Sequence, residues 1–189
     1  MQMDVDQKLV CNVPMELIDN VLNTISEEDW YDDDYRANVE NMDHTNSIPI
    51  FHSPLCASGK CDDDPIMDIS EQKHYSKYFP IIEPILNILK EHYDFKQYAA
   101  FLTRCHPKSV VGSHKDKGNF LTLCHRIHIP IQTNDQAMYI IENKMYNWKK
   151  GNVYEFDNMR SHSVYNGGDE PRIHLIINLY NLDHLPVTI

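Results

Sequence analysis

The sequence has no long apolar run: stretches such as Ile81–Ile82 and Ile85–Leu89 are far shorter than the ~20 residues that a membrane-spanning helix needs. Basic residues are few, 17 against 28 acidic ones, which gives a formal net charge of −11. Such a surface repels phosphate backbones, so we expect neither a nucleic-acid partner nor a membrane. The first residues, MQMDVDQK, lack the apolar segment of a secretory signal, and we therefore expect a cytoplasmic location.

Cysteine is also scarce. The five cysteines are odd in number and irregularly spaced, which excludes a disulfide framework and predicts reduced thiols. Cys56 and Cys61 have zinc-like spacing, but no second Cys/His pair accompanies them, so a zinc site is the weaker interpretation. Cys105 and Cys124 fall in strand-like segments, where we expect them to pack as small core residues.

The 189 residues, 42% of them hydrophobic and 24% charged, are typical of one globular domain. Apolar residues with helical spacing predict helices over about 14–26 and 79–93, with Pro14 in the first turn of one and Pro84 early in the other. Thr45–Phe51 predicts a strand, and Ser53–Gln72 predicts a surface loop that we consider a candidate lid. Residues 1–94 would thus support a core formed by residues 95–181.

From about residue 98 onward, short segments rich in Ile, Val, Leu, Tyr and Thr alternate with turn residues. This pattern is typical of a β-sandwich or barrel, and the fold class we predict is α+β, mainly β, with the N-terminal helices behind the sheet. The predicted strands are Tyr98–Cys105, Leu121–Gln132, Ala137–Asn143, Asn152–Phe156, Ser161–Tyr165 and Arg172–Tyr180.

Three residues have the types and order of a metal site. His114 and Asp116 lie two residues apart in a predicted loop, and His162 lies in a later strand. Two imidazoles and one carboxylate can occupy one face of an octahedral metal and leave three positions open, the arrangement of non-haem Fe(II) oxygenases. Arg172 follows His162 by ten residues, at the start of an apolar strand.

Alternation along two strands places cations together. Arg126 and His128 share one side of their strand, while His125 lies on the outer side. Arg172 and His174 share a side with Ile176 and Asn178, opposite a wholly apolar side. A barrel that binds an anion next to a metal explains this pattern, and so does a sheet with one solvated face. His174 and Asn178 therefore either line a cavity or pack in the strand, and we expect Trp148 to pack in the core.

Five segments resemble the aspartyl/asparaginyl β-hydroxylase family of Fe(II)/2-oxoglutarate-dependent dioxygenases, which includes proline hydroxylase-like members. The likeness spans about Thr103 to Leu179, and the Trp148–His162 part is its most specific portion. The matching segments are His106-Pro107, Arg126–Pro130, Trp148–Asp157, His162–Asn166 and Gly168–Ile173.

The resemblance implies a double-stranded β-helix, a jelly-roll or cupin-like barrel. It implies that His114, Asp116 and His162 ligate Fe(II) and that Arg172 pairs with the distal carboxylate of 2-oxoglutarate. Thr103 would be a hydroxyl partner there, and Arg126 and His128 would hold the other end of the cosubstrate. Animal aspartyl hydroxylases have Gly where this chain has Asp116, so the likeness at this position is to bacterial amino-acid hydroxylases.

The expected function is hydroxylation of an amino acid, free or as a side chain in a peptide or protein, with O2 consumed and 2-oxoglutarate decarboxylated to succinate. The alternative is a non-catalytic cupin-like protein that binds a metal or an anion. A zinc hydrolase is a third, weaker interpretation, because no general base accompanies a three-His or Cys-rich site.

Overall fold

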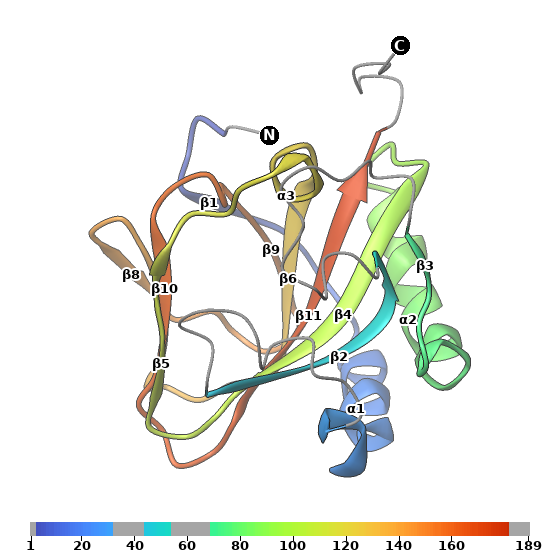
Figure 1. The fold of residues 1–189 in the computed structure, drawn as a ribbon, viewed down its shortest axis with the longest axis horizontal. Helices are drawn as coiled ribbons and strands as arrows, with labels where there is room; N and C mark the ends of the chain where they lie inside the picture. The colour runs from blue at the N-terminus through green and yellow to red at the C-terminus, as the bar shows by residue number, and fades with distance from the viewer. Residues whose placement is uncertain (1–2, 32–43, 54–68, 182–189) are drawn as a thin grey trace.

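The computed structural model describes residues 3–31, 44–53 and 69–181, which form two antiparallel sheets and the helices behind one of them (Figure 1). The major sheet has, in spatial order, β1 (Gln7–Asn12), β9 (Asn152–Phe156), β6 (His125–Gln132), β11 (Arg172–Tyr180), β4 (Gln97–Cys105), β2 (Thr45–His52) and β3 (Ser70–Glu71). The minor sheet has β5 (Ser109–His114), β10 (His162–Asn166), β7 (Ala137–Ile141) and β8 (Lys144–Tyr146).

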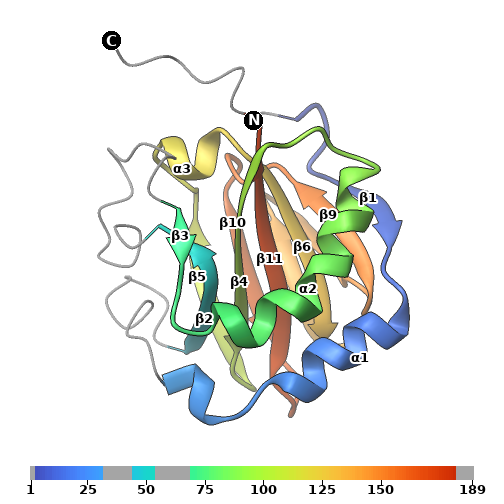
Figure 2. The same cartoon turned by 90° about the vertical axis from the view of Figure 1, so that its right-hand side faces the viewer.

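Two helices, α1 (Met15–Thr24) and α2 (Tyr75–Lys90), cover the face of the major sheet that points away from the minor sheet (Figure 2). The shorter elements are a 3-10 turn, η1 (Glu28–Tyr31), and α3 (Asn119–Thr122). The predicted α+β, mainly β arrangement with helices behind the sheet is confirmed. The N-terminal half also contributes β1, β2 and β3 to the major sheet.

The second helix differs from the prediction. It begins at Tyr75 rather than Phe79, so Pro80 and Pro84 both lie inside it and Pro84 is not in an early turn. Each proline removes a backbone donor from the helix. The helix persists because its apolar side is buried against the sheet. The free energy of this tertiary burial outweighs the low helix propensity of the two prolines. The buried residues of α2 are Tyr78, Ile82, Ile85, Leu86 and Leu89.

The largest apolar cluster lies between these helices and the major sheet. Ile127 and Ile129 of β6 and Leu175 and Ile177 of β11 all face it and are fully buried. These four side chains point away from the minor sheet, and they pack on helix residues such as Ile82. Burial of aliphatic side chains of this size contributes roughly 1.5–3 kcal/mol each. The helix-covered face is therefore the stabilising half of the molecule.

The opposite face of the major sheet is also covered. All nine residues of β11 are buried, because the minor sheet lies over the inner face. The interpretation of a sheet with one solvated face is therefore wrong. Aromatic residues fill much of the space between the sheets: Trp148 is buried and stacks on Tyr139 and Tyr154, as the expectation of a core role for Trp148 requires.

Several strand boundaries were predicted incorrectly. The first part of the predicted Leu121–Gln132 strand is α3, because Gly118 has a φ of 79° and its carbonyl accepts hydrogen bonds from the Leu121 and Thr122 amides. The β7 strand ends at Ile141, where Glu142 has a φ of 53° and turns the chain into β8. The short strands β1, β3, β5 and β8 were not predicted, and β3 lies within the segment assigned to a loop.

Candidate metal centre

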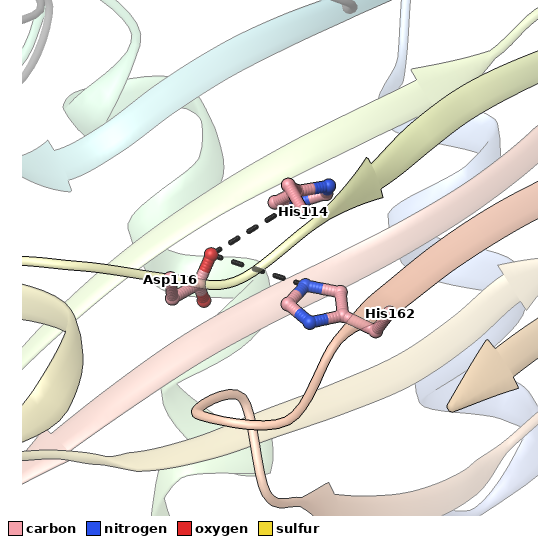
Figure 3. Close-up of side chains that lie close together, drawn as sticks. All are labelled: His114, Asp116 and His162. Atoms are coloured by element: carbon pink, nitrogen blue, oxygen red, sulfur yellow. Dashed lines mark ion pairs between the residues drawn. The ribbon is translucent and has the colours of Figure 1, made fainter. Parts of the chain in front are cut away.

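His114, Asp116 and His162 converge between the two sheets. His114 is the last residue of β5 and pairs with His162, the first residue of β10, so the prediction that His114 lies in a loop is wrong. One ligand atom from each of the three residues lies within 4.8 Å of the others. Asp116 Oδ1 is 3.8 Å from His114 Nε2 and 3.9 Å from His162 Nε2 (Figure 3).

The backbone fixes which ring nitrogens face the carboxylate. His114 Nδ1 lies 2.8 Å from the Gly112 carbonyl oxygen, and His162 Nδ1 lies 2.9 Å from the Arg160 carbonyl oxygen. A carbonyl oxygen only accepts, so both Nδ1 atoms carry the proton and donate it. In the neutral ring, each Nε2 then presents a lone pair, which is the form that binds a metal.

The protonation states suit a divalent cation. Burial lowers the pKa of His162 to about 4, so its ring is neutral near neutral pH. Burial by itself raises the pKa of Asp116, but the Arg126 charge, the neighbouring His162 ring and a hydrogen bond from Asn158 outweigh it, and the pKa lies below its usual value. Two imidazoles and one carboxylate are the donor set of a non-haem Fe(II) site.

A cavity of about 60 Å³ opens beside these three residues. A single water needs only about 10–15 Å³, so the cavity has room for a larger ligand. All seven residues to which the resemblance assigns a metal or cosubstrate role line it, whereas His174 and Asn178 are not among its lining residues. The seven are Thr103, His114, Asp116, Arg126, His128, His162 and Arg172.

Arg172 supplies a buried positive charge to this cavity. Its Nη2 donates to His174 Nδ1 at 2.8 Å, and its guanidinium lies 5.4 Å from the centroid of the Tyr139 ring. A guanidinium only donates, so His174 Nδ1 is an acceptor and the ring is neutral. Burial also lowers the pKa of His174 well below its usual value. Thr103 is the β4 partner of His174, on the same inner face.

Arg126 lies nearer the metal ligands. Its Nε is 3.8 Å from Asp116 Oδ2, and its Nη1 donates to Asn178 Oδ1 at 2.8 Å. Burial lowers the pKa of His128 well below its usual value, so this ring is also neutral near neutral pH. His128 Nδ1 lies 3.4 Å from His174 Nδ1, and these two rings join the residues of β6 to those of β11.

Three residues were predicted to be structural, and one of them, Cys105, both packs in the core and lines the cavity. His125 Nδ1 pairs with Glu155 Oε1 at 2.6 Å on the outer face, away from the cavity. Cys105 and Cys124 are both buried. Cys56 and Cys61, the alternative zinc pair, and most of the predicted Ser53–Gln72 loop lie outside the described residues.

Sequence reasoning missed several residues of the site. Tyr139 lines the cavity, and alternation along its predicted strand could have placed it there. Asn158 contacts Asp116, but no local pattern predicts a contact between residues 42 positions apart. Thr45, Val111 and Val164 also line the cavity.

Known proteins resemble this chain in both sequence and fold. The sequence profile of the Aspartyl/Asparaginyl beta-hydroxylase family matches residues 54–181. A viral collagen prolyl hydroxylase from Paramecium Bursaria Chlorella virus-1, solved as a 2OG complex, is 10% identical with a TM-score of 0.52, covering 93% of this chain and 96% of its own. A Pseudomonas putida prolyl-4-hydroxylase is 9% identical with a TM-score of 0.53, covering 93% and 91%.

A third similar structure, a 2OG-Fe(II) oxygenase family oxidoreductase from Burkholderia pseudomallei, is 12% identical with a TM-score of 0.51 and covers 71% of this chain and 66% of its own. No curated protein matches the sequence. At these identities the structures establish the fold alone, and they confirm the predicted double-stranded β-helix. No helix among the described residues is long and apolar enough to cross a membrane.

The family match covers more than half of the sequence. The chain therefore belongs to the aspartyl/asparaginyl β-hydroxylase family.

Proposed function

We propose that this family member is an Fe(II)/2-oxoglutarate-dependent dioxygenase that hydroxylates an amino acid, free or as a side chain in a peptide or protein. One observation carries the proposal: two imidazole Nε2 atoms, one carboxylate oxygen and the guanidinium of Arg172 share a single buried cavity. The family match and the two prolyl hydroxylases of similar fold support the same reaction class.

His114, Asp116 and His162 would hold the iron. Fe(II), when bound together with 2-oxoglutarate and O2, supplies the oxidising chemistry, in which the cosubstrate is decarboxylated to succinate. The three residues contribute two neutral donors and one negative charge, and the hydrogen bonds to the Gly112 and Arg160 carbonyls hold the rings in the ligating orientation.

Arg172 would bind the distal carboxylate of 2-oxoglutarate. A guanidinium can form two parallel charge-assisted hydrogen bonds to a carboxylate, whereas Lys offers only a point charge. His174 accepts a hydrogen bond from Arg172, and this bond fixes the orientation of the guanidinium. Thr103, which carries the hydroxyl, lies on the adjacent strand. Arg126 and His128 line the cavity between Asp116 and His174, where they would hold the other end of the cosubstrate.

The same walls exclude water from the site. Asp116, His128, His162 and Arg172 are each less than a tenth exposed, so their charges and dipoles act in a region of low dielectric. His114 is the more exposed ligand, with 28% of its side chain accessible. We therefore infer that substrate approaches the metal from the His114 side.

The decisive experiment measures succinate release with Fe(II), O2 and 2-oxoglutarate across free amino acids and peptides, with mass spectrometry for the gain of one oxygen atom. Anaerobic addition of Fe(II) and 2-oxoglutarate should produce a visible metal-to-ligand charge-transfer band. Binding of metal and cosubstrate with neither the band nor any substrate-dependent succinate would favour the non-catalytic cupin-like alternative.

A further inference from the structure

Asn158 touches the Asp116 carboxylate from the turn that connects β9 to β10. It is 1% exposed, and its Nδ2 donates to Asp116 Oδ2 at 3.0 Å and to the Leu121 carbonyl oxygen at 2.7 Å. Both partners only accept, so the side-chain nitrogen must be the atom that faces them. The Asn158 carbonyl in turn accepts a hydrogen bond from the Asp116 amide at 3.1 Å. Asn158 therefore holds Asp116 by both its backbone and its side chain.

The two oxygens of Asp116 have different surroundings. Oδ1 faces the Nε2 atoms of His114 and His162, at 3.8 and 3.9 Å. Oδ2 accepts the Asn158 hydrogen bond and lies 3.8 Å from Arg126 Nε. One oxygen is thus directed at the metal-binding position, and the other is directed at protein donors.

The turn that carries Asn158 is itself constrained. Asp157 Oδ1 accepts a hydrogen bond from the Met159 amide at 3.1 Å, and the Asp157 carbonyl accepts one from the Arg160 amide at 3.1 Å. The Arg160 carbonyl then accepts the Nδ1 hydrogen bond of His162 at 2.9 Å. A single short turn therefore orients two of the three candidate ligands.

We propose that Asn158 is a positioning residue that makes Asp116 a one-oxygen metal ligand. Its amide holds Oδ2 away from the metal, so that Oδ1 alone is offered. This inference rests on the proposed function, because it concerns the same metal site. It adds Asn158, a residue outside the ligand set, to the proposed metal site. It also explains how the metal would keep three positions open.

The distinction between one and two carboxylate oxygens matters for the chemistry. A carboxylate can bind a cation through one oxygen or through both. A carboxylate that bound through both oxygens would fill one of the three positions that the two-His, one-carboxylate set leaves open. Those positions are needed for the cosubstrate and O2. The Asn158 hydrogen bond disfavours this second mode.

The test compares metal binding by wild-type protein and by the Asn158→Leu variant, which has a similar side-chain volume and no amide. Dissociation constants are measured by calorimetry for Mn(II) and for Ni(II). Loss of a hydrogen bond to a ligating group typically costs 10- to 100-fold in metal affinity. We expect a loss of about this size for Mn(II), which prefers carboxylate oxygens, and a smaller loss for Ni(II), which imidazole suits.

Asn166 provides a matched control. It is fully buried, and its Nδ2 donates to the backbone carbonyls of Cys105, His106 and Glu170 rather than to a metal ligand. Asn166→Leu should lower the melting temperature and leave both metal affinities unchanged. Equal losses of affinity in the two variants would assign Asn158 a merely structural role and overturn the inference.

A double-mutant cycle tests whether Asn158 acts through Asp116. In an Asp116→Ala background, Asn158→Leu should leave the Ni(II) affinity unchanged, because the group it positions is gone. An additive effect would contradict the inference. If Asn158→Leu does not fold, Asn158→Ser replaces it in both experiments, since a serine hydroxyl is too short to replace the amide.

The wild-type measurement separates the two proposals. If the wild-type protein binds neither Mn(II) nor Ni(II) at this site, as judged against His162→Ala, the proposed function itself fails. If the wild type binds both metals and Asn158→Leu binds them equally well, only the positioning role fails.

Discussion

Alternate residues of β6 and β11 form two faces of the major sheet, and these faces differ in composition and in role. On the helix-covered face, Ile127, Ile129 and Ile177 are fully buried in an aliphatic cluster. On the cavity face, Arg126, His128 and Arg172 are also largely buried, but each is polar and each has a defined partner or orientation. The buried side chains on the helix-covered face therefore stabilise the fold, and those on the cavity face form the proposed site.

The cavity face is unfavourable for folding. Burial keeps His128 and His174 neutral, and within the part of the chain that the structure describes the buried Nε2 atoms of both rings and Nδ2 of Asn178 have no hydrogen-bond partner. Each buried polar atom without a partner costs roughly 1–3 kcal/mol. The aliphatic face offsets this cost, and the comparison predicts that substitutions on the two faces change different observables.

The largest expected effect is loss of a ligand on the cavity side. His162→Ala removes one of the two imidazoles, and we expect substrate hydroxylation and substrate-dependent succinate release to be abolished while the melting temperature falls little. Circular dichroism and succinate assays check the two halves of this statement. Full turnover by the variant would contradict the ligand role of His162.

The next effect concerns the cosubstrate. Arg172→Ala leaves a buried carboxylate of 2-oxoglutarate without its partner, at a cost of roughly 2–5 kcal/mol. We expect the KM for 2-oxoglutarate to rise by more than about 30-fold, since 1.4 kcal/mol corresponds to tenfold. Steady-state kinetics with saturating Fe(II) measure the change, and Arg172→Lys should recover only part of it. An unchanged KM would exclude the carboxylate-binding role.

A substitution on the helix-covered face should give the converse result. Ile177→Ala removes fully buried methyl groups and should lower the free energy of unfolding by about 2–5 kcal/mol. Turnover at a temperature where the variant is folded should equal that of wild type. Denaturant titration and the succinate assay test this, and a specific loss of turnover in folded protein would show that the two faces are coupled.

The smallest effect distinguishes the faces by pH. His128 and His174 have pKa values below those of the unfolded chain, so the unfolded state binds more protons and stability falls as pH decreases below about 6.5. Burial by itself raises the pKa of Glu155, which lies on the outer face, but hydrogen bonds from His125, Lys8 and Tyr93 lower it to about 2. The contribution of Glu155 to the free energy of unfolding is lost only as the pH falls below the pKa of an unfolded Glu, about 4.3.

Melting temperatures of metal-free protein measured from pH 8 to pH 3 separate the effect of the buried histidines, below about pH 6.5, from the effect of Glu155, below about pH 4.3. His174→Asn should flatten the dependence between about pH 6.5 and 5, and Glu155→Gln should change it only at lower pH. If His174→Asn left the upper range unchanged, the buried neutral state of His174 would be wrong.

Much of the fold was predictable because its signals are local. The strands Asn152–Phe156 and Arg172–Tyr180 have the predicted limits, since both are rich in β-branched, aliphatic or aromatic residues and turn residues bound them. The start of α2 was predicted too late, because tertiary burial outweighed two prolines. The β5 strand was missed because its six residues include Gly112 and two serines, a composition with little strand preference.

The sequence by itself determined which residue types were available for a metal and a diacid, and which strand residues share a face, because alternation depends only on neighbouring residues. Only the tertiary structure decided that His114 pairs with His162 and that Asn158 holds Asp116. Those contacts join segments more than 40 residues apart in the chain, and they depend on the order in which the strands assemble.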